Sequence, residues 1–434
     1  MAGRKFHLGY FTKFGPPAWQ ATNSRTDGSD WSNGRYFVDL ARRLDAACLD
    51  FLFFEDTLSV SEAVGGSREL DLKYALYAPK SDPIPLIPLL AHNTTGLGII
   101  ATCTTTFYPP WHVARLFSTV DGLSGGRVGF NVVTTSETTS AQNFGLDRMP
   151  SHADRYAKAA EFLDVVNGLW DGWEHDALVR DVETNTYVDA TKVHALDHVG
   201  EYFRVRGPLN TPRSPQGRPL IAQAGGSDRG RAFASKYADL ILAGAYGGPD
   251  EMKAFRDDVK QRVRGHGRNP DHVRVMFLVA VHFSDRPGAT ITDLTSDAKF
   301  EALVVQNASE LDLDLSRFDP DGPFPMDLEP GGHTSIYDGM KLLGQQGMTF
   351  REVISTVGVG GSWQPIGTPE AIADELIEVM EYIGGDGVML LVNDVGDDAY
   401  ITNVTERLVP ALQRAGAMQT AYHPGTLRDK LLSF

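Results

Sequence analysis

The sequence predicts an α/β fold, a (β/α)8 TIM barrel with long insertions at the carboxyl face of its strands. Eight short apolar segments run along the 434 residues, and helical patterns fill the gaps between them. Regular alternation of strand and helix is typical of a parallel sheet, and eight repeats favour closure into a ring. An open, doubly wound sheet is the alternative that the same pattern allows.

The eight strand segments are mostly continuous apolar runs, as expected for parallel strands that are buried on both faces. The active site of such a barrel is built from the loops that follow the strands, so polar residues near the strand ends are the first candidates. In chain order the predicted strands cover residues 6–11, 50–54, 96–102, 128–133, 219–223, 239–243, 273–281 and 387–392.

Helices are predicted between the strands from their apolar spacing and their capping residues. Ser151 and Asp154 have the spacing of a capping box, so a helix should begin at residue 152 and run to about residue 170. Its apolar positions keep the helical period of 3.6 residues. Further helices are predicted over residues 35–47, 110–123, 229–237, 249–264, 369–382 and 401–415.

Long stretches without a regular pattern interrupt the barrel. Loops of this length in a compact domain are usually functional, and most of these stretches follow a predicted strand. We expect residues 1–434 to form a single domain, with residues 283–366 as an excursion that acts as a mobile lid. The irregular stretches cover about 12–34, 57–83, 134–150, 171–218 and 283–366.

Composition excludes several classes of partner. The formal net charge of −16 argues against nucleic acid or an anionic membrane surface. Cys48 and Cys103 form no CxxC pair, so neither a zinc ribbon nor a disulfide framework is indicated. The first residues lack the apolar core of a signal peptide, and no segment approaches the roughly 18 apolar residues of a membrane span. We therefore expect a cytoplasmic protein.

A glycine-rich segment between the fifth strand and the next helix is a candidate phosphate site. It reads QAGGSDRG over residues 223–230. Gly226 would let the backbone approach a ligand closely, Ser227 would donate a hydroxyl, and the helix start offers free N–H groups to an anion. The alternative is an ordinary strand-to-helix turn in which Ser227 or Asp228 caps the helix.

His152 and Tyr156 lie four residues apart at a helix start, so they share one face. Both could donate hydrogen bonds to an anion beside that helix start. The alternative is a surface histidine next to a tyrosine that packs in the core.

Three polar residues lie at or near the ends of apolar strands. Asp56 ends the second strand, Thr102 ends the third, and Asn131 lies late in the fourth. Burying a polar side chain without a partner is unfavourable by a few kcal/mol, so each of them needs a partner. A bound cofactor and another buried polar group are both possible partners. No metalloprotease or P-loop motif is present, so we expect no metal.

Several stretches together carry a resemblance to a known family. They include FLFFED at 51–56, ATCTTTFYPPWHVAR at 101–115, LSGGRVGFNVVTT at 123–135 and SHADRYAKAAEFLDVVNGLWDG at 151–172. In order and spacing, the chain resembles the flavin-dependent monooxygenases of the bacterial luciferase-like superfamily. The resemblance is to the branch that contains nitrilotriacetate, long-chain alkane and dibenzothiophene sulfone monooxygenases, and it spans nearly the whole chain.

The resemblance implies a two-component FMN-dependent monooxygenase. Reduced FMN would come from a separate NAD(P)H:flavin reductase, and dioxygen would be the co-substrate that oxidises or cleaves a small organic substrate. Relatives of this kind form homodimers or homotetramers. By position, the family's cofactor contacts fall on Asp56, Thr102, His152, Tyr156, Ser227 and the backbone of Gly226, and its catalytic, dioxygen-facing side falls on Asn131 and Thr102.

Two departures from the family pattern are visible. Gly226 stands where relatives usually have serine or alanine, and the segment FTKFGPPAW at 11–19 lacks the histidines that some relatives place near the substrate. The second departure leaves the catalytic base unassigned. The alternative functions are a deazaflavin-dependent hydride-transfer oxidoreductase and a flavin-binding barrel without catalysis.

Overall fold

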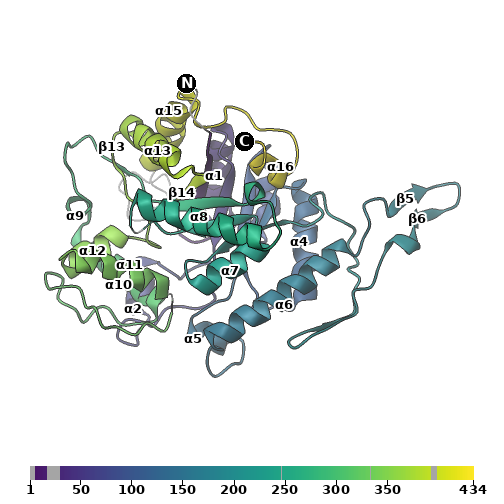
Figure 1. Cartoon of the computed structure of the whole chain (residues 1–434), viewed down its shortest axis with the longest axis horizontal. Helices are drawn as coiled ribbons and strands as arrows, with labels where there is room; N and C mark the ends of the chain where they lie inside the picture. The colour runs from purple at the N-terminus through teal and green to yellow at the C-terminus, as the bar shows by residue number, and fades with distance from the viewer. Residues whose placement is uncertain (1–4, 17–29, 246, 333, 392–397) are drawn as a thin grey trace.

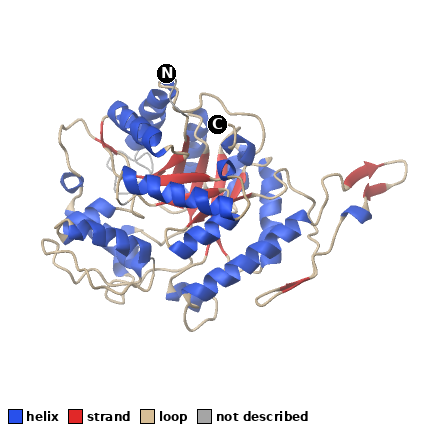
Figure 2. Cartoon of the chain, viewed as in Figure 1, coloured by secondary structure: helices blue, strands red, loops and turns tan. Residues whose placement is uncertain are grey.

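Eight parallel strands close into a barrel in the order β1-β14-β11-β10-β9-β4-β3-β2. The computed structural model describes residues 5–16, 30–245, 247–332, 334–391 and 398–434, and helices surround the strands (Figures 1 and 2). The predicted (β/α)8 barrel is confirmed, and the open sheet is wrong. The barrel strands are β1 (His7–Lys13), β2 (Phe51–Glu55), β3 (Gly98–Thr104), β4 (Val128–Val133), β9 (Leu220–Ala224), β10 (Leu240–Ala243), β11 (Arg274–Val279) and β14 (Gly387–Leu391).

Pairing between the first and last strands closes the ring. β1 pairs in parallel with β14 on one side, where His7 lies opposite Gly387, and with β2 on the other side. All eight predicted strands are present, although the predicted end of the last one, Val392, lies outside the described residues. β3 runs two residues beyond its predicted end, so Thr102 lies within the strand and not at its last position.

Apolar side chains fill the barrel interior, and a short helix closes its amino end. Leu427 and Leu431 of α16 (Leu427–Leu431) belong to the same apolar cluster as the inward-facing strand residues. Because the interior is filled, the barrel is a packed core and not a pore, which leaves the carboxyl end for a ligand. The inward-facing residues include Phe51, Phe53, Ile100, Leu220, Ala222, Leu240, Leu242, Met276 and Met389.

The predicted helices are present close to their predicted bounds. Ser151 caps α6 by accepting a hydrogen bond from the Asp154 N–H at 3.2 Å, while its hydroxyl donates to the Asp154 carboxylate at 2.6 Å. These helices are α1 (Arg35–Ala46), α4 (Pro110–Ser124), α6 (His152–Asp171), α7 (Asp228–Tyr237), α8 (Pro249–Gly265), α13 (Pro369–Ile383) and α14 (Asp398–Asn403), which continues through a π-helical turn (Val404–Leu408) into α15 (Val409–Arg414).

The excursion at 283–366 is helical, so its reading as an irregular stretch is wrong. Ser296 and Thr349 cap two of its helices, and the apolar faces of these helices pack into a core separate from that of the barrel. Amphipathic helices that bury their apolar faces against each other need no regular strand alternation, which is why the barrel pattern did not reveal them. Its helices are α9 (Ile291–Leu294), α10 (Asp297–Leu311), α11 (Thr334–Gln345) and α12 (Phe350–Val357), and the paired strands β12 (His282–Phe283) and β13 (Ile366–Gly367) join its two ends (Figure 1).

The other stretches predicted to be irregular also contain short elements. The stretch at 57–83 holds α2 (Glu69–Tyr74), which packs against α10, and it is followed by α3 (Leu86–His92). The stretch at 134–150 holds α5 (Thr138–Asn143). Residues 171–218 form an arm that projects from the barrel and carries two hairpins (Figure 1). The hairpin strands are β5 (Leu178–Asp181), β6 (Thr186–Val188), β7 (His198–Val199) and β8 (Arg204–Val205), and short 3-10 helices cover Trp31–Asn33, Ala190–Lys192 and Pro270–His272.

None of the helices in the described ranges combines the length and the apolar character that a bilayer crossing requires.

Candidate active site

A cavity of about 880 Å³ lies at the carboxyl end of the barrel. Its size falls within the range that is usual for cofactor and small-molecule sites. The excursion provides part of its wall through residues of α10 and the start of α11. All seven residues predicted for the site line this cavity: Asp56, Thr102, Asn131, His152, Tyr156, Gly226 and Ser227.

Thr102 and Asn131 form a hydrogen-bonded pair on neighbouring strands. They lie opposite each other in the β3–β4 register, and the Asn131 Nδ2 donates to the Thr102 Oγ1 at 2.8 Å. The Thr102 hydroxyl in turn donates to the Phe54 carbonyl at 2.8 Å. The Asn131 Oδ1 is buried and has no hydrogen-bond partner. The pair therefore offers a ligand an acceptor whose position is set by the barrel register.

Asp56 follows β2 directly and is half-buried at the cavity wall. Burial raises the pKa of its carboxyl to about 7, with nearby Glu55 and Asp82 acting in the same direction and Lys80 opposing them. At neutral pH the carboxyl is therefore divided between its acid and its anion. It can donate a hydrogen bond to a ligand or accept one.

Ser227 is the N-cap of α7. Its Oγ accepts a hydrogen bond from the Gly230 N–H at 3.1 Å, which leaves the hydroxyl proton for a ligand. The capping role and the ligand-facing position are therefore compatible. The Asp228 side chain is exposed and bonds to the Arg262 Nη2 at 2.6 Å, so it neither caps the helix nor faces the cavity.

Close packing explains the glycines that precede Ser227. A Cβ on Gly225 would lie 2.9 Å from the carbonyl carbon of Gly230, which is a main-chain clash. A Cβ on Gly226 would lie 3.1 Å from the Ser335 Oγ, near the start of α11 in the excursion. The loop is thus packed between the first turn of α7 and the excursion, with its backbone at the cavity wall.

His152 and Tyr156 share a face of α6, as their spacing predicts. Their ring centroids lie 4.8 Å apart, and the Tyr156 ring also packs edge-on against Phe233 at 5.4 Å. Burial raises the pKa of Tyr156, while a hydrogen bond with the Gln223 side chain opposes that shift. The phenol therefore stays protonated near neutral pH and can donate to an anion.

Two further cavity residues were given no role by the sequence reasoning. The Gln223 Oε1 and the Arg155 Nε are buried and have no hydrogen-bond partner, although the Arg155 Nη1 donates to the Pro150 carbonyl at 2.7 Å. Burial lowers the pKa of Arg155, which still remains a cation. Gln223 ends an apolar strand, so the rule that selected Asn131 would also have found it. Arg155 has the pattern of an ordinary helix-surface charge and gave no signal.

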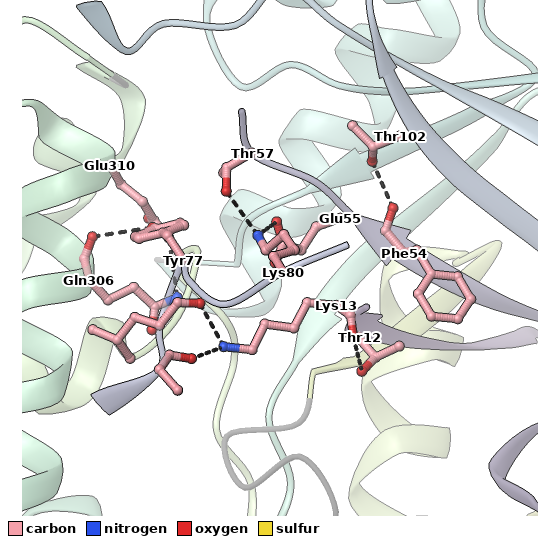
Figure 3. Close-up of polar contacts among 12 residues, drawn as sticks. Thr12, Lys13, Phe54, Glu55, Thr57, Tyr77, Lys80, Thr102, Gln306 and Glu310 are labelled. Carbon is pink, nitrogen blue, oxygen red and sulfur yellow. Dashed lines mark hydrogen bonds and ion pairs between the residues drawn. The ribbon is translucent and has the colours of Figure 1, made fainter. Parts of the chain in front are cut away.

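Charged residues gather at a second part of the cavity wall, which is lined by Lys13, Glu55 and Glu310, with Lys80 bonded to Glu55 (Figure 3). The Lys80 Nζ bonds both carboxylate oxygens of Glu55 at 2.8 Å and the Thr57 hydroxyl at 2.9 Å. The Lys13 Nζ donates to the carbonyls of residues 75 and 76, and burial together with Lys80 lowers its pKa to about 8. Glu310 reaches this wall from α10, and burial raises the pKa of its carboxyl to about 7.

The residues of this cavity fit a ligand that combines an anionic group with ring N–H groups. The α7 start with Ser227, together with Arg155, suits a phosphate, because helix N-termini and guanidinium groups are its usual partners. The orphaned acceptors of Asn131 and Gln223 suit N–H donors. In the part of the chain that the structure describes, no three His, Cys, Asp or Glu side chains come together as a metal site would require.

Comparisons with known proteins agree with this geometry. The family model described as luciferase-like monooxygenase matches residues 6–387. The chain belongs to the luciferase-like monooxygenase family. It is 36% identical to nitrilotriacetate monooxygenase component A from Aminobacter aminovorans over 416 residues, which cover 92% of this chain and 89% of that protein. The predicted family and the predicted enzyme class, a flavin-dependent monooxygenase, are confirmed.

Solved structures of this family share the whole fold. The crystal structure of long-chain alkane monooxygenase (LadA) matches with a TM-score of 0.85 and 30% identity, over 99% of this chain and 95% of that one. A riboflavin lyase (RcaE), solved with modified FMN and its substrate riboflavin, matches with a TM-score of 0.84 and 30% identity over 99% and 96% of the two chains. The barrel and its inserted segments are therefore shared by a monooxygenase and a lyase.

Proposed function

We propose that this monooxygenase is the oxygenase component of a two-component system that uses FMN. A separate NAD(P)H:flavin reductase provides reduced FMN, and dioxygen is used to oxidise or cleave a small organic substrate. One observation carries the proposal: Asp56, Thr102, Asn131, His152, Tyr156, Gly226 and Ser227 line a single cavity. The similarity to a protein named as a component A and to a lyase solved with modified FMN supports it.

At the phosphate end of the site, Ser227 and Tyr156 donate their hydroxyl protons to the anion. The loop has no side chain at Gly226, so its backbone would be able to approach a bound phosphate closely. His152 and the buried guanidinium of Arg155 add further donors, so the anion gains several charge-assisted hydrogen bonds.

At the end of the site that would hold the flavin ring, the Asn131 Oδ1 would accept a hydrogen bond from an N–H group of that ring. The Thr102 hydroxyl holds the Asn131 amide in place. Asp56 lies at the same edge of the barrel and can change its protonation state near neutral pH. Reduced FMN, when bound, provides the activation of dioxygen, which no side chain of the protein can perform. The protein's own task is to position the substrate and to exclude water.

The excursion at 283–366 acts as the lid of a single barrel domain that covers residues 1–434. Its α10 and the start of α11 already form part of the cavity wall, and Ser335 lies against Gly226 in the loop before α7. Lids of this kind sequester a reaction from water. The chain assembles as a homodimer or homotetramer, which size-exclusion chromatography with light scattering will test.

Reconstitution tests the proposed activity. The purified chain, FMN, a flavin reductase and NADH are incubated with a panel of small organic compounds, and products are analysed by mass for a gain of one oxygen atom. A product that forms only when chain, FMN and reductase are all present is expected. Hydride transfer to a deazaflavin without oxygen consumption would contradict the proposal.

A binding experiment tests the phosphate anchor. The double variant Tyr156→Phe, Ser227→Ala should bind FMN more weakly by about 100-fold or more, because it removes two hydrogen bonds to a charged group and each contributes about 1.5–3 kcal/mol. The matched control is Tyr237→Phe, Ser235→Ala, which changes the same two residue types on α7 outside the cavity. Equal loss of affinity in both double variants would exclude the anchor.

A further inference from the structure

Glu310 carries an unsatisfied carboxylate oxygen in the cavity wall. Its Oε2 is buried and has no hydrogen-bond partner among the described residues, and its Oε1 accepts a long hydrogen bond, 3.4 Å, from the Gln306 side chain. The Tyr77 hydroxyl is near enough to interact with the carboxyl and to lower its pKa, against the larger effect of burial. Burying a carboxylate without a partner is strongly unfavourable. Buried polar groups of this kind in native proteins are usually satisfied by a ligand or an ion.

We propose that Glu310 binds a basic nitrogen of the substrate, so that the enzyme acts on organic amines that enter the cavity as cations. The reaction itself rests on the function proposed above. The binding of an amine by this carboxylate is a property of the chain alone and can be measured without catalysis.

The surrounding charges favour a cation over an anion or a neutral donor. The side chains that face Glu310 are Gln306 on its own helix, Tyr77 from the loop after α2, and the carboxylates Glu55 and Glu137, both of which raise the pKa of Glu310. Two like charges therefore add to the negative potential at this oxygen. An incoming carboxylate would be repelled, whereas an ammonium group would be attracted.

The lysines near this wall already have hydrogen-bond or ion-pair partners. Lys80 is held by Glu55 and Thr57, and Lys13 is held by two carbonyl groups. Figure 3 shows Lys80 and Glu55 lying between Glu310 and Thr102. Lys299 is the cation that α10 places at the cavity. It lies 11 residues before Glu310, which is roughly 16 Å along the helix. Among the described residues, Glu310 thus has no counter-ion at this wall.

Apolar and aromatic groups form much of the remaining wall. Phe11, Phe53, Ile84 and Tyr108 line the same cavity, together with the Tyr77 ring beside Glu310. Such surfaces suit an apolar body, and aromatic faces also attract ammonium groups. The expected substrate is therefore an apolar amine and not a polycarboxylate.

A pH dependence follows from this arrangement. The Glu310 carboxyl, with its pKa near 7 in the free chain, must ionise before it can pair with an ammonium group. Affinity for an amine should therefore rise as the pH passes through 7, and fall again only as the amine loses its proton near pH 10, the usual range for alkyl ammonium groups. A neutral ligand of the same shape should show no such rise.

Calorimetric titration of the full chain with matched probes tests the proposal, both without flavin and with saturating FMN. The probes are phenethylamine, phenethyl alcohol and phenylacetate, which share an aromatic body and differ in the end group. The wild type should bind the amine about tenfold or more tightly than either other probe, as expected for a charge-assisted hydrogen bond. Glu310→Gln should abolish that preference and leave FMN affinity unchanged.

Glu301→Gln is the matched control, because it removes the same charge from the same helix outside the cavity. It should retain the amine preference. Tighter binding of phenylacetate than of the amine, equal binding of amine and alcohol, an amine preference that survives in Glu310→Gln, or no binding of any probe would each overturn the proposal. Failure of FMN binding or of oxygen transfer with an intact amine preference would instead contradict the proposed function alone.

Discussion

The two ends of the barrel differ in how their buried charged groups are paired. At the amino end, Asp386 pairs with Lys260 at 2.9 Å and with Arg256 at 3.2 Å, and His7 bonds to Asp50 at 2.9 Å. At the carboxyl end, four buried polar atoms at the cavity have no partner: Asn131 Oδ1, Gln223 Oε1, Arg155 Nε and Glu310 Oε2.

The difference separates stability from function. Paired charges at the amino end hold strands, α8 and the carboxyl terminus together, and their removal should destabilise the fold. Unpaired groups at the other end weaken the fold, and we interpret them as contacts for a ligand. Substitutions at the amino end should therefore lower stability, whereas substitutions at the carboxyl end should mainly lower ligand affinity. Variants at both ends test whether this difference holds.

The largest effect is expected for Asp386→Ala. It leaves buried Lys260 and Arg256 without their carboxylate, which should lower the free energy of unfolding by about 3–5 kcal/mol. Urea denaturation measures the loss, and FMN affinity should be unchanged under native conditions. The exposed pair tested by Asp257→Ala on α8, in which Asp257 bonds Lys253, should lose less than about 1 kcal/mol.

The same site predicts an acid sensitivity. Burial alone would raise the pKa of Asp386, but Lys260 and Arg256 outweigh it and hold the pKa below its ordinary value. Its stabilising contribution is therefore present above the unfolded pKa of about 4 and is lost as the pH falls through the folded value. Equal acid sensitivity in Asp386→Ala and wild type would contradict this assignment.

The next largest effect is expected for Gly225→Ala. The added Cβ would lie 2.9 Å from the Gly230 backbone, so the loop before Ser227 must move. Overpacking of this kind is unfavourable by about 1–3 kcal/mol, and a displaced loop should weaken FMN binding about 10- to 100-fold. Gly265→Ala, where a Cβ meets open space, is the control, and fluorescence titration with FMN distinguishes the two.

A smaller effect on affinity is expected for Asn131→Leu. It removes one hydrogen bond to Thr102 but also an unsatisfied carbonyl, so the free energy of unfolding should change by less than about 1 kcal/mol. FMN affinity should fall about tenfold, because one ring contact is lost. Asn307→Leu is a matched control: Asn307 also buries an unpartnered Oδ1, but it does not line the cavity. A large loss of stability in Asn131→Leu would instead show that Asn131 has a structural role.

The smallest effect is expected for Asp56→Asn and concerns pH. Burial raises the pKa of Asp56 to about 7, so its contribution to stability is full below the unfolded pKa of about 4 and is lost as the pH rises to 7. The variant should remove that decline and be more stable than wild type above pH 7, by about 1 kcal/mol after allowance for solvent in the cavity. Parallel pH profiles of unfolding for both proteins would refute this reading.

Much of the barrel and its ring of polar residues could be predicted from the sequence. Asp56, Thr102 and Asn131 were found because parallel strands bring their carboxyl ends to one edge, where a short apolar run already marks each strand. Ser227 and Tyr156 were found because helix starts carry local capping and spacing signals. The helices of the excursion were missed because their partners are one another and not the barrel.

Strand period, capping and apolar runs are local signals, so the ring of strands and the polar residues at its carboxyl edge could be derived from the sequence. Which other groups share the cavity with them emerged only from the folded chain. Glu310 and Ser335 lie far along the chain from the strand ends, and Lys13 lies in the first strand without a distinguishing pattern. Their charges and contacts acquire meaning only when the excursion packs over the barrel, since burial and pairing depend on neighbours that are distant in sequence.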